Sequence, residues 1–166
     1  MYVRTGVAMG PIQFGAGHER GLRPGTENVP HIVALGEAAR LARITLAQEA
    51  AHMTALRDRL QRLLAAAIPG LRLNGHPSER LPNTVNLSFP AVSGWQVLDA
   101  APEVAASTGS ACHAGDHAVS GVLAAMGLTP EAAAGAVRLS LGRFTTEAET
   151  DRAAKALVAA WKLLTA

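Results

Sequence analysis

The sequence of 166 residues predicts an α/β chain in which helices pack on a small sheet. Three observations predict this class: a long segment with apolar residues at helical spacing, two short segments that alternate apolar and polar residues, and a final segment with helical spacing again. The length fits one domain, or one domain with a piece of another. Hydrophobic residues make up 49% of the chain, which is enough to form a core.

The first predicted element is a long helix. The apolar opening "MYVR" fits the tail of a strand, and a glycine-rich loop from Gly6 to Thr26 follows it. Asn28 and Pro30 predict the helix start, Asn28 as a capping side chain and Pro30 through its fixed φ. The helix runs to about Ile68, where a Pro-Gly pair ends it. Its buried face is predicted to carry Met53, Leu56, Leu60, Leu63 and Ala67.

Strands follow the long helix. The two strong candidates are "TVNLSF" at 84–89 and "VRLSL" at 137–141. Two weaker candidates are "LRL" at 71–73 and "VAAS" at 104–107. Strict alternation places Thr84, Asn86 and Ser88 together on the polar face of the first. Arg138 and Ser140 share the polar face of the second, opposite its apolar residues.

Two capping boxes predict further helices. Ser93 with Gln96 predicts a short helix that extends to about Ala101. Thr146 with Glu149 predicts the last helix in the same way. The core stripe of that helix is predicted to be Leu157, Trp161 and Leu164.

Composition narrows the possible function classes. The net charge of +2 is small and no lysine-rich block occurs, which argues against nucleic-acid binding. The sequence contains no run of 18 apolar residues, so no membrane span is expected. The N-terminus does not resemble a signal peptide. A single cysteine excludes an internal disulfide framework. The expectation is a cytoplasmic protein that binds neither nucleic acid nor membrane.

The stretch "RGLRPGTEN", residues 20–28, is a rigid and cationic turn. It has three possible interpretations: an ordinary surface turn, a nucleic-acid contact, or a clamp for a small anion.

The only cysteine, Cys112, lies in "STGSACHAGD", residues 107–116. Small residues on both sides predict an exposed loop, whereas a core cysteine has large apolar neighbours. Exposure and the adjacent His113 favour a reactive thiolate. Two alternatives remain: a surface cysteine without function, and a metal site formed by Cys112, His113 and His117. The metal site is the weaker of the two, because three ligands in one loop lack the second half of known zinc spacings.

Arg138 is the second candidate. A guanidinium fixed on a strand is suited to bidentate binding of a carboxylate. The alternative is an ordinary exposed strand arginine.

Four motifs together carry a family resemblance. In this order, "GAGHERGLRPGTEN", "LPNTVNLSF", "STGSACHAG" and "VRLSLGRFTTEAE" resemble the C-terminal part of the cysteine desulfurases of the NifS/IscS kind. These are enzymes of the aminotransferase class V group that depend on pyridoxal 5'-phosphate (PLP), and the selenocysteine lyases are close relatives. The resemblance covers essentially the whole chain. It implies the small domain of an aspartate aminotransferase-like fold, with helices packed on a small, mostly antiparallel sheet.

The resemblance also implies roles for three residues. Cys112 is the nucleophile that takes sulfur from L-cysteine as a persulfide, with release of L-alanine. Arg138 binds the substrate carboxylate. Thr26 contacts the PLP phosphate of the partner subunit across a homodimer interface, so the cationic turn would be an anion clamp. The sulfur would pass to an acceptor protein for iron–sulfur cluster or thio-cofactor assembly, and no metal is required.

One departure from the family is large. The family's Schiff-base lysine, in "HKxxGPKG", precedes the region that this chain resembles, and the only lysines here are Lys155 and Lys162 in the last predicted helix. Residues 1–28 would be the trailing edge of the large PLP domain, and residues 29–166 would be the small domain. Without the lysine, the chain would be inactive alone. The alternatives are a selenocysteine lyase and a non-catalytic sulfur-carrier or interaction module. Thr26 and Arg138 together argue against a carrier, which needs neither.

Overall fold

The computed structural model describes residues 2–109 and 120–166. The elements in chain order are η1 (His18–Gly21), α1 (Val29–Ala67), β1 (Arg72–Asn74), β2 (Thr84–Ser88), α2 (Gly94–Asp99), α3 (Gly121–Ala125), α4 (Pro130–Ala134), β3 (Ala136–Ser140) and α5 (Glu147–Thr165). The predicted class, helices with a small antiparallel sheet, is confirmed. Contacts divide the chain into a first unit, residues 1–45, and a second unit, residues 46–166. The predicted boundary at residue 28 remains a prediction.

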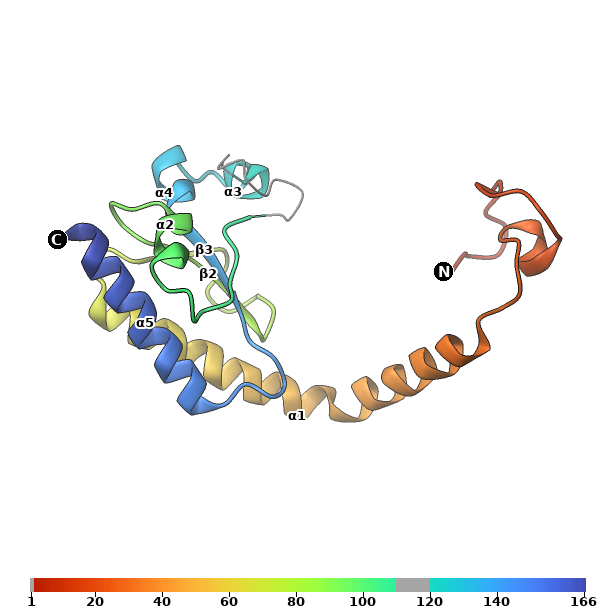
Figure 1. Cartoon of the computed structure of the whole chain (residues 1–166), viewed down its shortest axis with the longest axis horizontal. Helices are drawn as coiled ribbons and strands as arrows, with labels where there is room; N and C mark the ends of the chain where they lie inside the picture. Colours follow the sequence, from red (N-terminus) through yellow and green to blue (C-terminus); the bar gives the residue numbers. More distant parts are fainter. Residues whose placement is uncertain (1, 110–119) are drawn as a thin grey trace. The chain divides into compact units, whose positions relative to one another are not determined.

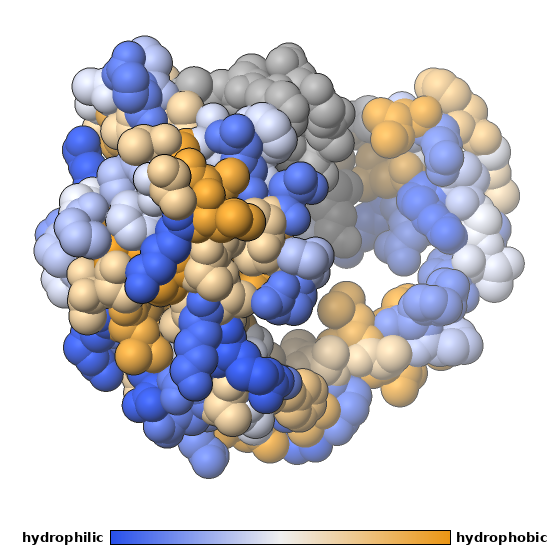
Figure 2. Space-filling view, turned by 60° about the vertical axis from the view of Figure 1, so that its left-hand side comes forward, coloured by the Kyte–Doolittle hydropathy of each residue, from blue (hydrophilic) through white to orange (hydrophobic). Residues whose placement is uncertain are grey.

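The first unit has no core of its own. None of residues 2–45 is buried, and polar and apolar side chains mix over its surface (Figure 2). Residues 2–4 form no strand, contrary to the prediction, because no other strand pairs with them. The predicted helix start is confirmed, since the Asn28 Oδ1 accepts a hydrogen bond from the His31 N–H at 3.3 Å.

The buried face of α1 differs in part from the prediction. Leu56 and Leu60 are buried as expected, but Leu63 is 37% exposed. The buried stripe continues instead through Leu64 and Ile68, at steps of four residues. Residues four apart lie nearly above one another on a helix, so a stripe that repeats by four stays on one face.

The three strands form an antiparallel sheet in the order β1-β2-β3. The predicted alternation of β2 and β3 is confirmed: Val85, Leu87, Val137 and Leu139 are buried, whereas Arg138 is exposed. The sheet therefore has one apolar face and one polar face. Of the weaker candidates, the first forms β1, while residues 104–107 make only an isolated bridge at Ser107.

Helices cover the apolar face of the sheet. In Figure 1, α5 lies beside the C-terminal part of α1, and ion pairs from Arg59 to Glu147 and Asp151 join the two helices. Both predicted capping boxes are confirmed, and α2 and α5 begin directly after Ser93 and Thr146. In the predicted stripe of α5, Leu157 is buried but Leu164 is 37% exposed, because it lies in the last turn.

Two short helices, α3 and α4, were not predicted. Leu123 of α3 packs with Ala133 of α4 and with Ala136 at the start of β3. These contacts form a small apolar cluster separate from the main core. Among the described residues, no helix combines the length and the apolar character needed to cross a membrane.

Candidate functional site

The turn around Thr26 is held by its own arginine. Arg23 Nη1 donates hydrogen bonds to the carbonyl oxygens of Gly25 and Thr26, at 2.9 and 3.0 Å. Gly25 has a φ of +101°, which favours glycine. A Cβ on Gly15 would lie 2.8 Å from the Pro24 Cβ, so the preceding loop approaches the turn closely. The guanidinium of Arg23 thus fixes the shape of the turn, and Thr26 is exposed at its end.

Arg138 lies in the middle of β3 with an exposed side chain. Within residues 2–109 and 120–166, no ion pair and no side-chain hydrogen bond engages its guanidinium. Three other arginines of the second unit are paired with acids, Arg59 with Asp151, Arg80 with Asp58, and Arg143 with Glu49. Arg138 therefore presents its donors on the polar face of the sheet, and no acid in the described part of the chain pairs with them.

The backbone of Arg138 is paired on its outer side with Ser107. The Arg138 N–H donates to the Ser107 carbonyl at 2.7 Å, and the Ser107 N–H donates to the Arg138 carbonyl at 3.3 Å. The Ser107 hydroxyl donates to the Gly109 carbonyl at 2.7 Å and closes a turn. Ser107 precedes Cys112 by five residues. The chain that leads toward Cys112 thus departs from a point beside Arg138.

Cys112, His113 and His117 lie outside the described residues, and so does the predicted metal alternative that they would form. Among the residues that are described, no group of three or more His, Cys, Asp and Glu side chains could hold a metal ion.

Asn83 links the start of β2 to the end of β3. Its carbonyl accepts from the Leu141 N–H at 2.9 Å, and its Nδ2 donates to the Leu141 carbonyl at 3.3 Å. Register across β2 and β3 is thereby fixed next to the polar face.

Arg143 lies beyond the end of β3 and not on a strand. The strand ends at Ser140, and a turn follows in which the Gly142 N–H donates to Thr145 Oγ1 at 2.9 Å. Arg143 pairs with Glu49 at 3.3 Å and lies over the Phe144 ring, 4.9 Å from its centre. It is thus engaged away from Arg138.

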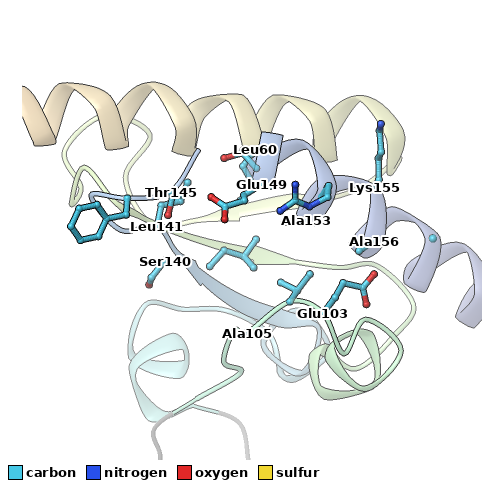
Figure 3. A pocket seen from close by; sticks show the side chains of 16 residues that line it. Leu60, Glu103, Ala105, Ser140, Leu141, Thr145, Glu149, Ala153, Lys155 and Ala156 are labelled. Atoms are coloured by element: carbon cyan, nitrogen blue, oxygen red, sulfur yellow. The ribbon is translucent and has the colours of Figure 1, made fainter. Parts of the chain in front are cut away.

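The two lysines lie on α5, whose buried residues pack against the apolar face of the sheet. Arg138 projects from the opposite face, because Val137 and Leu139 on either side of it are buried in the core. Lys155 lines a cavity of about 1010 Å³ between α5 and the segments that carry Glu103 and Leu141, and it points away from Ser140 (Figure 3). Neither Arg138 nor Ser107 lines this cavity. The lysines and Arg138 thus do not share one site.

The structure therefore joins two of the three regions singled out in the sequence. Arg138 and the residues that lead to Cys112 meet at β3, whereas Thr26 belongs to the first unit. The pairing of Ser107 with Arg138 was missed, because a bridge between segments so far apart in sequence has no local signal.

Comparisons with known proteins agree with the predicted resemblance. The family model for aminotransferase class V matches residues 8–153. A protein named cysteine desulfurase 2, from Trichormus variabilis, is 47% identical over 154 residues, which are 92% of this chain and 38% of that protein. The chain thus spans less than half the length of this relative.

Comparison with solved structures also shows similarity to proteins of the NifS kind. A protein titled NifS-like aligns with a TM-score of 0.82 and 34% identity, over 99% of this chain and 41% of the other. A structure titled SspA in complex with cysteine aligns with a TM-score of 0.55 and 27% identity, over 83% of this chain and 37% of the other. On the match of its sequence and the agreement of its fold, the chain belongs to the aminotransferase class V family.

Proposed function

We propose that this chain is part of a cysteine desulfurase, an enzyme that removes sulfur from L-cysteine and releases L-alanine. The observation that carries the proposal is the setting of Arg138. Its exposed guanidinium has no acidic partner among the described residues, and its backbone pairs with Ser107, five residues before Cys112. The name of the Trichormus relative and the cysteine bound to SspA support the choice of substrate.

Arg138 binds the carboxylate of L-cysteine. Its planar fork can donate two parallel hydrogen bonds to the two carboxylate oxygens. Both backbone hydrogen bonds of Arg138 are made with Ser107, and Asn86 of β2 is its register partner on the other side. This fixed backbone reduces the entropy lost when the guanidinium is ordered by substrate.

Cys112 is the nucleophile. Its thiolate attacks the sulfur of the bound L-cysteine and forms a persulfide as the bond between the substrate sulfur and its Cβ breaks. The electron pair of that bond stays with the substrate carbon, which takes up a proton and becomes the methyl group of L-alanine. No external oxidant or reductant is needed, because the sulfur is transferred from one carbon chain to a thiol. Five residues of chain beyond Ser107 can span up to about 17 Å, enough to reach a substrate held by Arg138.

PLP would supply the electron sink for this reaction. The described residues offer one contact to such a cofactor, at its phosphate group. The exposed Thr26 lies in a turn that Arg23 holds rigid, and its hydroxyl can donate a hydrogen bond to a phosphate. They do not supply the Schiff-base lysine, because Lys155 and Lys162 lie on α5, on the side of the sheet opposite to Arg138. We therefore propose that residues outside this chain provide the lysine, and that this chain alone is inactive.

Two partners follow from the proposal. Thr26 reaches the PLP phosphate of a second subunit in a homodimer. An acceptor protein takes the persulfide sulfur from Cys112 for iron–sulfur cluster or thio-cofactor assembly.

The test uses a chimeric enzyme, in which this chain replaces the matched region of the Trichormus variabilis relative and which is loaded with PLP. With L-cysteine, we expect L-alanine and a persulfide on Cys112, detected by mass spectrometry of the peptide that contains it. The Cys112→Ser variant should bind PLP normally and form no persulfide. Persulfide formation at the wild-type rate in this variant would exclude Cys112 as the nucleophile.

A further inference from the structure

Arg138 belongs to a row of polar residues that crosses the whole sheet. Asn74 of β1 pairs with Asn86 of β2, Asn86 pairs with Arg138 of β3, and Arg138 pairs with Ser107. Residues directly opposite one another on antiparallel strands direct their side chains to the same face. Two amides, a guanidinium and a hydroxyl therefore lie side by side on the polar face, and the row contains no acid.

The Asn86 side chain is held from one side. The buried Asn74, 7% exposed, donates from its Nδ2 to the Asn86 Oδ1 at 2.7 Å and to the Ser88 hydroxyl at 2.8 Å. A short hydrogen bond from a buried amide restricts Asn86 to one rotamer. Asn86 itself is half-buried, so part of its amide reaches the surface on which Arg138 lies.

This arrangement leaves Asn86 with donors next to Arg138. An amide whose oxygen is engaged has two N–H donors on its nitrogen, and a guanidinium has only donors. The two groups cannot hydrogen-bond to each other, but both can donate to one carboxylate, which accepts about four hydrogen bonds. Neutral donors beside a cation also leave its charge uncompensated, which favours an anionic ligand.

We propose that Asn86 is a second carboxylate-binding residue, which donates from its Nδ2 to the same substrate carboxylate as Arg138. The inference rests on the proposed function, and it adds a residue that selects α-amino carboxylates over amines without a carboxylate. Asn74 on the neighbouring strand is its anchor, and the Ser88 hydroxyl in turn holds the Asn74 amide.

The experiment measures steady-state kinetics of the PLP-loaded chimeric enzyme with L-cysteine. Asn86→Leu keeps the size of the side chain and removes its donors. It should raise KM about tenfold, corresponding to about 1.4 kcal/mol, with kcat changed less than about twofold, as expected for a ground-state binding contact. Thr84→Val is the matched control, because Thr84 lies on the same strand and face, opposite Ser140 rather than Arg138. Its KM should stay at the wild-type value.

The Asn86→Asp variant separates binding from positioning. A carboxylate beside Arg138 would pair with the guanidinium and compete with substrate, so the proposal predicts a larger rise in KM than for Asn86→Leu. The opposite amide orientation would direct the Asn86 oxygen to Arg138. In that case Asn86→Asp would retain nearly wild-type KM, and the proposal would be overturned.

The outcomes also separate this inference from the proposed function. A wild-type KM for Asn86→Leu together with a strongly raised KM for Arg138→Ala would overturn the role of Asn86 and leave the proposed function intact. Wild-type kinetics for both variants would contradict the carboxylate site itself, and both proposals with it.

Discussion

Two arginines of this chain lie in family-like motifs but are used differently. In the turn at residues 23–26, the Arg23 guanidinium donates to the carbonyl oxygens of Gly25 and Thr26, so its donors are used within the turn. On β3, the N–H and the carbonyl of Arg138 are both hydrogen-bonded to Ser107, while its guanidinium has no ion pair among the described residues.

The difference shows how to tell a structural arginine from a binding one. Both residues are exposed enough to bind a ligand, and sequence alone gives both the same charge. What separates them is which atoms the fold already engages. An arginine that hydrogen-bonds its own turn stabilises that turn, whereas one held by its backbone retains its donors for a ligand.

Among the substitutions that test this difference between Arg23 and Arg138, the largest loss of activity is expected at Arg138. In the complete enzyme we expect the pair between Arg138 and the substrate carboxylate to be shielded from water, and removing one partner of such a pair typically costs about 2–5 kcal/mol. Arg138→Ala should therefore lower kcat/KM for L-cysteine by about 30-fold or more. Arg138→Lys should recover only part of this loss, because an ammonium keeps the charge but not the fork. Steady-state kinetics of the chimeric enzyme check both variants. Full recovery with lysine would mean that charge alone, and not bidentate geometry, binds the substrate.

A smaller effect is expected at Arg23. Two exposed hydrogen bonds from one nitrogen should contribute about 1 kcal/mol to the order of the turn, so Arg23→Ala should weaken PLP binding by about fivefold. Thr26→Val should weaken it at least as much, because it removes the proposed phosphate contact. Fluorescence titration of PLP into the apo form of the chimeric enzyme measures both. Loss of PLP binding in Arg23→Ala with normal binding in Thr26→Val would assign the phosphate to Arg23 and reverse the comparison.

Arg143 provides a third arginine, which is paired with an acid. Its pair with Glu49 and its contact with Phe144 are partly exposed, and such pairs typically contribute about 0.2–1 kcal/mol. Arg143→Ala should therefore leave KM for L-cysteine nearly unchanged and lower thermal stability slightly, as shown by a thermal melt beside the kinetics. If this variant lost cysteine binding, the carboxylate site would have to move from β3 to the turn that follows it.

The smallest effect concerns pH. Arg59 donates two hydrogen bonds to Asp151, at 2.6 and 2.8 Å, and this contact lowers the pKa of that carboxyl. A lowered pKa in the folded state stabilises the fold at pH values above the ordinary aspartate pKa, and the stabilisation is lost as the pH falls through the folded value. Asp151→Asn should therefore be less stable than wild type at neutral pH, and the two should converge in acid. Urea unfolding at several pH values measures this, and a constant difference at all pH values would contradict it.

The parts of the fold that could be predicted are those with local causes. Strict alternation located β2 and β3, and the capping boxes at Ser93 and Thr146 located α2 and α5. The helix α4 also had a local signal, since Thr129 caps it and Pro130 occupies its first turn. In contrast, the exposed Leu63 and the turn that takes Arg143 off the strand depend on packing, which no short window of sequence contains.

The candidate site divides in the same way. Alternation placed Arg138 and Asn86 on polar faces of their own strands, and the structure confirms both placements. That Asn74, Asn86, Arg138 and Ser107 form one row depends on strand register, which is a long-range property. The roles of Cys112, Arg138 and Thr26 in chemistry remain predictions.

The central claim is that Arg138 binds the carboxylate of the substrate. The most direct test compares two unreactive inhibitors that differ only in that group, S-methyl-L-cysteine and S-methylcysteamine, on the chimeric enzyme and its Arg138→Ala variant. The wild-type enzyme should bind the carboxylate-bearing inhibitor more tightly by about 30-fold or more. The Arg138→Ala variant should lose most of this preference and keep only the smaller part that Asn86 contributes. If Arg138→Ala kept the wild-type preference, another group would bind the carboxylate, and this account of the site would be wrong.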